Sequence, residues 1–197
     1  VSRSVDDHTA RASDGSAGSS KISPTPDHGG LDGDGGLLLI GPALVDSVTR
    51  CTLLWKPAPS RNVAPADVNA PLGLMDIPAT VCEIAGVEVP EERKLDGVSL
   101  LALLLEGKPL PERTLFWGFR DRYAVRQGPW KLLVNQTGRR RATADGPLGT
   151  RGSLVHLADD LGEQHDLAGQ HPERVKAMLT ALAAWKEAVS TSRPERK

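Results

Sequence analysis

The chain has 197 residues, enough for one modest domain with a buried core, and its formal net charge is -1. So small a charge gives no global field that favours nucleic acid or a membrane surface, and we expect neither as a partner. No run of about 18 apolar residues occurs, so we expect no membrane-spanning helix.

The cysteines and the first residues favour a reducing compartment. The chain begins without a basic stretch followed by an apolar segment, so we expect no secretory signal. Cys51 and Cys82 form no C-x-x-C motif, and Cys82 falls on an apolar helical pattern. Two buried thiols are therefore favoured over a disulfide, and the expected location is cytoplasmic.

Residues 1–36 are rich in Gly, Ser, Asp and Thr and predict a poorly ordered segment. Residues 13–20 show no apolar period at all. In the stretch that follows, Pro24 and Pro26 remove backbone donors, which argues against a central strand there.

The pattern of a folded protein begins after residue 36. Residues 52–55 (T-L-L-W) predict a short buried strand, which Pro57 and Pro59 stop. The pattern then changes from strand-like to helical.

Two helices are predicted next. The first has Asp76 as its N-cap, Pro78 in its first turn and Gly86 at its end. Its predicted apolar face consists of Ile77, Val81, Ile84 and Ala85. The second covers residues 100–105 and ends at Gly107.

The last part of the chain predicts a small antiparallel sheet with one helix packed on it. The expected strands are residues 114–119, 123–126, 130–134 and 153–157. A turn at Gln127-Gly128-Pro129 joins the second strand to the third. The helix begins at Pro172, and its apolar face is Val175, Met178, Leu179, Leu182, Trp185 and Val189. Strands followed by a packing helix are an α+β signature.

The most informative stretch runs from Thr25 to Pro42 and reads T-P-D-H-G-G-L-D-G-D-G-G-L-L-L-I-G-P. It resembles the metal-binding loop of the sulfatase family, closest to the arylsulfatase and phosphonate monoester hydrolase branch of the alkaline-phosphatase superfamily. That branch typically reads T-S-D-H-G-x-x-x-G-D-H-G-L-L-L-K-G-P. The resemblance implies that Asp27 and His28 are metal ligands. Gly35 and Ile40 replace a histidine and a lysine that contact the sulfate in the family.

Four further segments match the family in the family's own order. They are L-M-D-I-P-A-T at 74–80, L-D-G-V-S-L-L at 95–101, A-V-R-Q-G-P-W-K-L at 124–132 and L-V-H-L-A-D-D-L-G-E-Q-H-D-L-A at 154–168. The resemblance implies an α/β, alkaline-phosphatase-like fold, of which this chain is the C-terminal portion. We expect three parts: 1–36 with the degraded metal loop, 37–112 as the C-terminal part of the α/β core, and 113–197 as the subdomain of antiparallel sheet plus helix.

In this family sulfate-ester hydrolysis needs a nucleophile, a divalent metal, and His and Lys side chains on the sulfate. The nucleophile is a formylglycine made in a C/S-x-P-S-R motif, and that motif is absent from this chain. Residues 57–61 (P-A-P-S-R) mimic it, but a proline takes the place of the nucleophile, so we interpret them as a surface turn.

The cofactor implied by the resemblance is a divalent metal, Ca²⁺ or Mn²⁺. A carboxylate such as that of Asp27 suits Ca²⁺, and an imidazole such as that of His28 tilts the choice toward Mn²⁺. Two ligands alone bind such an ion weakly, so a solvated loop without metal stays open as an alternative. The more distant histidines, His156, His165 and His171, are interpreted as surface or capping residues rather than ligands.

Two functions remain open. The first is a sulfatase-family hydrolase of sulfate, phosphate or phosphonate monoesters, with a small-molecule ester as substrate; we expect this chain alone to be inactive and assign it no catalytic residue. The second is a non-catalytic remnant or interaction module with the sulfatase fold, whose exposed apolar surface a second chain covers. An unrelated α+β domain would require several family-like segments to occur in order by chance.

Overall fold

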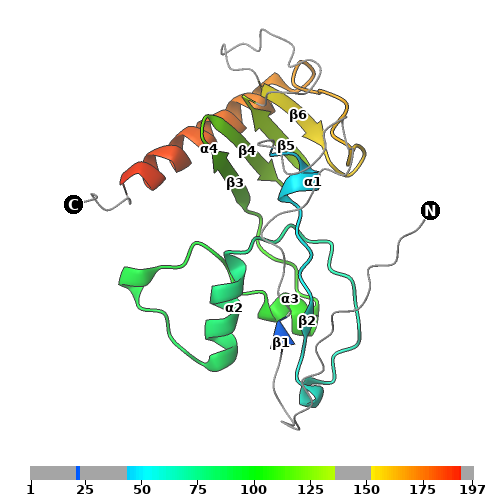
Figure 1. Cartoon of the computed structure of the whole chain (residues 1–197), viewed down its shortest axis with the longest axis vertical. Coiled ribbons are helices and arrows are strands. Elements are labelled where there is room, and N and C mark those ends of the chain that lie inside the picture. Colours follow the sequence, from blue (N-terminus) through cyan, green and yellow to red (C-terminus); the bar gives the residue numbers. More distant parts are fainter. Residues whose placement is uncertain (1–20, 23–43, 136–151, 192–197) are drawn as a thin grey trace.

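The structure is a computed structural model, and it describes residues 21–22, 44–135 and 152–191. Two groups of elements are visible in Figure 1. One is a sheet with a long helix across it, and the other contains two helices, α2 and α3, and a pair of very short strands. No helix of the described residues is long and apolar enough to cross a membrane.

A four-stranded antiparallel sheet forms the centre of the first group. Its strands are β3 Thr114–Phe119, β4 Arg122–Gln127, β5 Trp130–Val134 and β6 Gly152–His156, and they lie in chain order. The β4–β5 hairpin closes where Gln127 pairs with Trp130, and Gly128 adopts a φ of 55° there. This confirms the predicted turn, since glycine adopts positive φ without steric cost. The limits of β3 and β5 match the prediction residue for residue, while β6 lies one residue earlier than expected.

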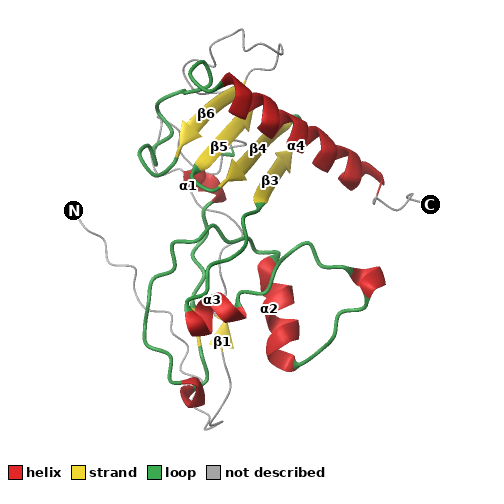
Figure 2. Cartoon of the chain, turned by 180° about the vertical axis from the view of Figure 1, so that it is seen from behind, coloured by secondary structure: helices red, strands yellow, loops and turns green. Residues whose placement is uncertain are grey.

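The helix α4, Pro172–Thr191, covers one face of this sheet (Figure 2). The buried core between them consists of Val125, Leu132, Val134, Leu154, Val175, Met178 and Leu182. Trp185 adds a stacked contact with Phe116, with ring centroids 5.2 Å apart and planes at 7°. The predicted helical face is therefore correct except for Val189, which is 47% exposed because the end of α4 projects past the edge strand β3.

A four-residue helix, α1 Asp46–Thr49, lies on the opposite face of the sheet, as the two views agree (Figures 1 and 2). Val45 and Val48 pack there against Ala124 and Leu133, with Trp117 beside them. The sheet is thus covered on both faces. This helix was not predicted, because four residues carry no readable helical period.

The second group contains α2 Asp76–Ala85 and α3 Leu101–Glu106. Each ends at a glycine with positive φ, Gly86 at 66° and Gly107 at 68°, as the sequence predicted. Single 3₁₀ turns occur at Pro59–Arg61 and Glu91–Arg93. The first of these overlaps P-A-P-S-R and confirms that this segment is a turn.

The strand predicted at residues 52–55 is largely wrong. The observed strand β2 is only Trp55–Lys56, and it pairs antiparallel with β1, Lys21–Ile22. Leu54 is 63% exposed rather than buried. A buried strand needs backbone partners on its edges, and in the described residues β2 has one partner of two residues.

The burial of α2 matches the prediction only in part, because Ile77 and Ile84 of the predicted face are half-buried while Ala85 is exposed. Its buried residues are the polar Asp76 and Thr80, whereas Val81, on the predicted apolar face, is 46% exposed. Asp76 is also not the N-cap, since Met75 precedes the helix and Asp76 is its first residue. The reason is that the carboxylate of Asp76 bonds to other segments instead of to the amides of its own helix.

Candidate functional site

The predicted metal ligands, Asp27 and His28, lie outside the described residues. So do Gly35 and Ile40, the positions at which the family contacts sulfate. The described chain resumes at Leu44, four residues after Ile40. Among the residues that the structure does describe, no group of three or more His, Cys, Asp or Glu side chains could hold a metal ion.

Asp76 is the centre of a buried polar network that joins two of the family-like segments, 74–80 and 95–101, to Arg113. Its Oδ2 accepts the amide of Gly73 at 2.7 Å, and its Oδ1 accepts the amide of Val98 at 3.0 Å. Arg113 donates from Nη1 to Oδ1 at 2.6 Å and from Nη2 to Oδ2, which makes the pair bidentate. Thr80 extends the network by accepting the amide of Leu100 at 2.9 Å.

The charge of Asp76 is stabilised where it lies. Burial alone would raise the pKa of its carboxyl, but hydrogen bonds from Arg113, Gly73 and Val98 outweigh burial and lower the pKa below its usual value. Gly97 belongs to the same junction, since a Cβ there would lie 1.9 Å from the carbonyl oxygen of Met75. The segments L-M-D and L-D-G are thus required for packing, and no acceptor of Asp76 is left for substrate chemistry.

Lys131 forms a second buried centre, on the α1 side of the sheet. Its side chain has no solvent exposure, and its Nζ lies 3.1 Å from Glu163 Oε1 and 3.9 Å from Asp46 Oδ1. The same Nζ donates to Thr49 Oγ1 at 3.2 Å and lies 5.8 Å from the ring centroid of Trp117. Burial lowers the pKa of Lys131, and the charges of Glu163 and Asp46 offset that effect only in part.

The sequence prediction missed this centre, although one signal was available. A charged residue, Lys131, interrupts the apolar run of a strand that was expected to be buried, and a buried charge needs a partner. Nothing in the pattern around Asp46 or Glu163 marks them as those partners, because they are distant in sequence.

The segment that follows β6 is held by two aspartates. Asp166 Oδ1 accepts the amides of Leu154 at 3.0 Å and Ala168 at 2.9 Å. Asp160 Oδ2 accepts the amide of His165 at 2.7 Å. Burial would raise the pKa of Asp160, but its hydrogen bonds lower it on balance. This part of the family-like pattern therefore also serves to shape a turn.

Of the three histidines in the described residues, His156 and His171 pack against Trp130. The rings of His156 and His171 meet the Trp130 ring edge-on, with centroids 4.6 Å and 4.8 Å away. His156 Nδ1 lies 2.5 Å from Asp159 Oδ2, and the carbonyl of His171 accepts the amide of Val175 at the start of α4. The bond to the start of α4 fits the predicted capping role of His171, whereas the packing of both rings on Trp130 was not predicted.

The remaining histidine, His165, has an 80% exposed side chain, and its Nδ1 lies 3.4 Å from Asp160 Oδ2. It therefore lies at the surface, as predicted.

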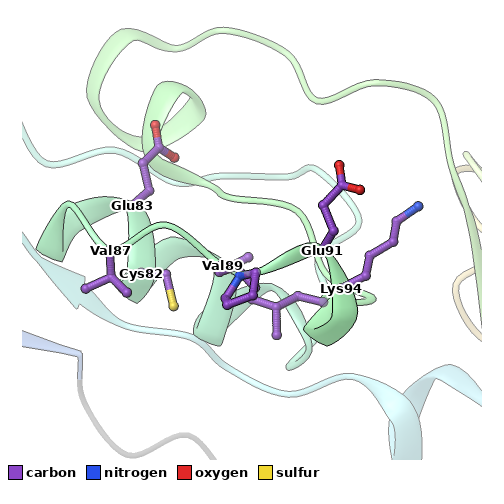
Figure 3. Close-up of a pocket in the computed structure, with 9 residues that line it drawn as sticks. Cys82, Glu83, Val87, Val89, Glu91 and Lys94 are labelled. Carbon is purple, nitrogen blue, oxygen red and sulfur yellow. The ribbon is translucent and has the colours of Figure 1, made fainter.

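A shallow pocket of about 600 Å³ lies between α2 and the segment 87–95 (Figure 3). Cys82 lines it together with Val87 and Val89, while the carboxylate of Glu83 and the ammonium of Lys94 point away from it. None of the predicted site residues lines this pocket. Both cysteines are free and only half-buried, so the prediction of two free thiols is correct but that of full burial is not.

Comparison with known proteins identifies the fold to which the described residues belong. No family model matches the chain. An arylsulfatase of Hemicentrotus pulcherrimus is 36% identical over 71 residues, which is 36% of this chain and 13% of that protein.

Among solved structures, the phosphonate monoester hydrolase of Agrobacterium radiobacter has a TM-score of 0.62 at 22% identity, covering 83% of this chain and 34% of that chain. A protein in complex with its substrate D-glucosamine-2-N,6-O-disulfate has a TM-score of 0.61 at 16% identity, with coverages of 90% and 36%. A 2-O GAG sulfatase has a TM-score of 0.54 at 20% identity, with coverages of 87% and 36%.

The described residues therefore have the fold that the sequence predicted: part of an alkaline-phosphatase-like α/β fold, with a small antiparallel sheet and a C-terminal helix. The resemblance of the chain to the C-terminal portion of the sulfatase family is confirmed. The chain spans about a third of the length of these solved structures.

Proposed function

We propose that this chain is a portion of a sulfatase-family hydrolase whose parent reaction is the metal-dependent hydrolysis of sulfate, phosphate or phosphonate monoesters. The observation that supports the proposal best is that the family-like segments occur in the family's own order. Four residues of these segments also occupy the two buried networks that hold the fold; they are Asp76, Gly97, Arg126 and Lys131. A small-molecule ester as substrate is supported by the sulfated sugar bound to one of the solved neighbours.

The metal-binding part of the proposal rests on Asp27 and His28. A carboxylate suits Ca²⁺ and an imidazole tilts the choice toward Mn²⁺, and either metal would neutralise the ester's negative charge and activate the nucleophile. We assign the substrate-contact positions to Gly35 and Ile40, neither of which can donate a side-chain hydrogen bond. Loss of one such contact in a hydrolytic site costs about 3 to 4 kcal/mol of transition-state stabilisation.

We therefore propose that the chain alone does not turn over substrate. The C/S-x-P-S-R nucleophile motif is absent from the sequence. We also propose the division of the chain into 1–36 with the degraded metal loop, 37–112 as the core part and 113–197 as the sheet subdomain. The two free thiols support a cytoplasmic location, where disulfides are rare.

An activity assay tests the proposal directly. The purified chain is incubated with an aryl sulfate and an aryl phosphate in the presence of Ca²⁺ or Mn²⁺, beside the variant Asp27→Ala. We expect no turnover from either. Turnover that disappears in Asp27→Ala would contradict the proposed inactivity and reveal a complete site.

The second function, an interaction module, is supported by the surface around α2. Large apolar side chains are exposed in α2 and in the segments directly before and after it; they are Leu74, Met75, Val81, Val87 and Val89. Isolated exposed apolar residues are normal, but five within 16 consecutive residues favour an interaction surface. We propose that a second polypeptide with the complementary part of the fold covers it.

A further inference from the structure

Lys131 has no role in the proposed chemistry, yet it lies fully buried at the centre of the sheet face opposite α4. Burying an ammonium group costs several kcal/mol after relaxation, and an apolar side chain of similar length would avoid that cost. The buried charge is therefore explained by the elements that it holds in place. Its contacts come from two directions, the turn after β6 and the helix α1.

Glu163 supplies the first contact and orients the amino group of Lys131. Its side chain is 1% exposed, and its Oε1 lies 3.1 Å from Lys131 Nζ. Because both groups are buried, each compensates the charge of the other.

Helix α1 supplies the second contact. The Thr49 hydroxyl donates to the Val45 carbonyl at 3.1 Å, so its lone pairs are available to accept from Lys131 Nζ at 3.2 Å. Asp46 Oδ1 lies 3.9 Å from Lys131 Nζ and 3.6 Å from Arg126 Nη1. The ammonium thus contacts the first and the last residue of the helix.

A helix of four residues is not stable by itself, because nucleation costs more than one turn of hydrogen bonds returns. The position of α1 is therefore set by its contacts with the sheet. Val45 and Val48 provide apolar contact, which is non-directional. The bonds of Lys131 are directional and select one placement of the helix on that apolar surface.

We infer that Lys131 is a positioning residue: its ammonium, held by Glu163, fixes α1 on the sheet and so fixes where the chain leaving the candidate metal loop joins the fold. The inference rests on the proposed function for that loop. Leu44, the first described residue after the candidate loop, directly precedes Val45 and α1, so the placement of α1 sets where the described chain resumes.

The test compares Lys131→Met with Arg113→Met in the full chain. The two variants each break a buried ion pair, but only Lys131 contacts α1. Amide hydrogen exchange at residues 44–50 is expected to be about tenfold faster in Lys131→Met, relative to β4 and β5, and unchanged in Arg113→Met. The dissociation constant for Mn²⁺ alone is expected to rise in Lys131→Met.

Two further variants separate positioning from simple charge balance. The double variant Lys131→Met with Glu163→Gln leaves no unpaired charge at that site. Its global stability should therefore recover, while amide exchange at residues 44–50 stays fast. Exchange restored to the wild-type rate would overturn the inference. Thr49→Val removes the contact of the ammonium with the last residue of α1, together with the hydroxyl's own bond to the Val45 carbonyl, and buries no unpaired charge. It should speed exchange there about three- to tenfold, even if Lys131→Met does not fold.

The two measurements fail independently. A wild-type chain that binds no Mn²⁺ would contradict the proposed metal loop, while the exchange data would still decide the role of Lys131. Unchanged exchange at residues 44–50 in both Lys131→Met and Thr49→Val would overturn the inference, whatever the affinity for Mn²⁺.

Discussion

At the scale of single residues, Asp76 carries the clearest energetic consequence. Its carboxylate is fully buried, and its bidentate partner Arg113 is mostly buried. Asp76→Asn retains the shape but leaves the guanidinium without a counter-charge. We expect a loss of about 3 to 5 kcal/mol in the free energy of unfolding, measured by urea denaturation at neutral pH. The exposed Asp67→Asn serves as control, and an equal effect of both variants would contradict the assigned role.

The same pair gives the fold an acid-sensitive contribution. The pKa of Asp76 is lower in the folded chain than its ordinary value of about 3.9. Its contribution to stability is therefore complete above that value and is lost as pH falls toward and through the folded pKa. The difference in stability between wild type and Asp76→Asn should shrink over that acid range, and a difference that is constant with pH would show that the charge does not contribute.

At the scale of elements, α4 is held by side chains that the helical period identified in advance. Met178 is fully buried between α4 and the sheet, whereas Val189 lies beyond the sheet edge at 47% exposure. Met178→Ala should cost about 2 to 5 kcal/mol, because it removes transfer free energy and leaves a cavity. Val189→Ala, as its control, should stay within about 0.5 kcal/mol.

Urea unfolding followed by circular dichroism measures both changes. Similar losses in the two variants would mean that the sheet extends further along α4 than the structure shows. A negligible loss in Met178→Ala would mean that α4 is not packed on the sheet in solution.

At the scale of the whole molecule, we expect the exposed apolar surface around α2 to control whether the isolated chain associates with itself. We expect the chain to self-associate at micromolar concentration and to bind a hydrophobic dye, because large apolar patches drive association. Val81→Ser combined with Val87→Ser should reduce both. Leu161→Ser is the matched control, since Leu161 is 56% exposed but lies in the turn after β6, away from this surface.

Light scattering and dye fluorescence measure this outcome. A wild-type chain that is monomeric and does not bind the dye would contradict the proposal that a second polypeptide covers the surface. Equal effects of the double variant and of Leu161→Ser would show that total apolar exposure, and not this surface, controls association.

The sequence alone determined the local elements of this chain. Short runs rich in apolar and aromatic residues predicted β3 and β5 within their observed limits, and glycines at 86, 107 and 128 marked the ends of α2 and α3 and the β4–β5 turn. These features depend on neighbours a few residues apart, so their physical cause is visible in the order of residues.

The tertiary structure decided which side chains are buried and which charges meet. Val81 and Leu54 fit apolar patterns, yet they are exposed, because a pattern does not contain the surface that must cover them. Asp76 with Arg113 and Lys131 with Asp46 join residues 37 and 85 positions apart. The packing of the elements determines which residues form such pairs. Because burying an unpaired charge is costly, each residue of a pair then depends on its partner.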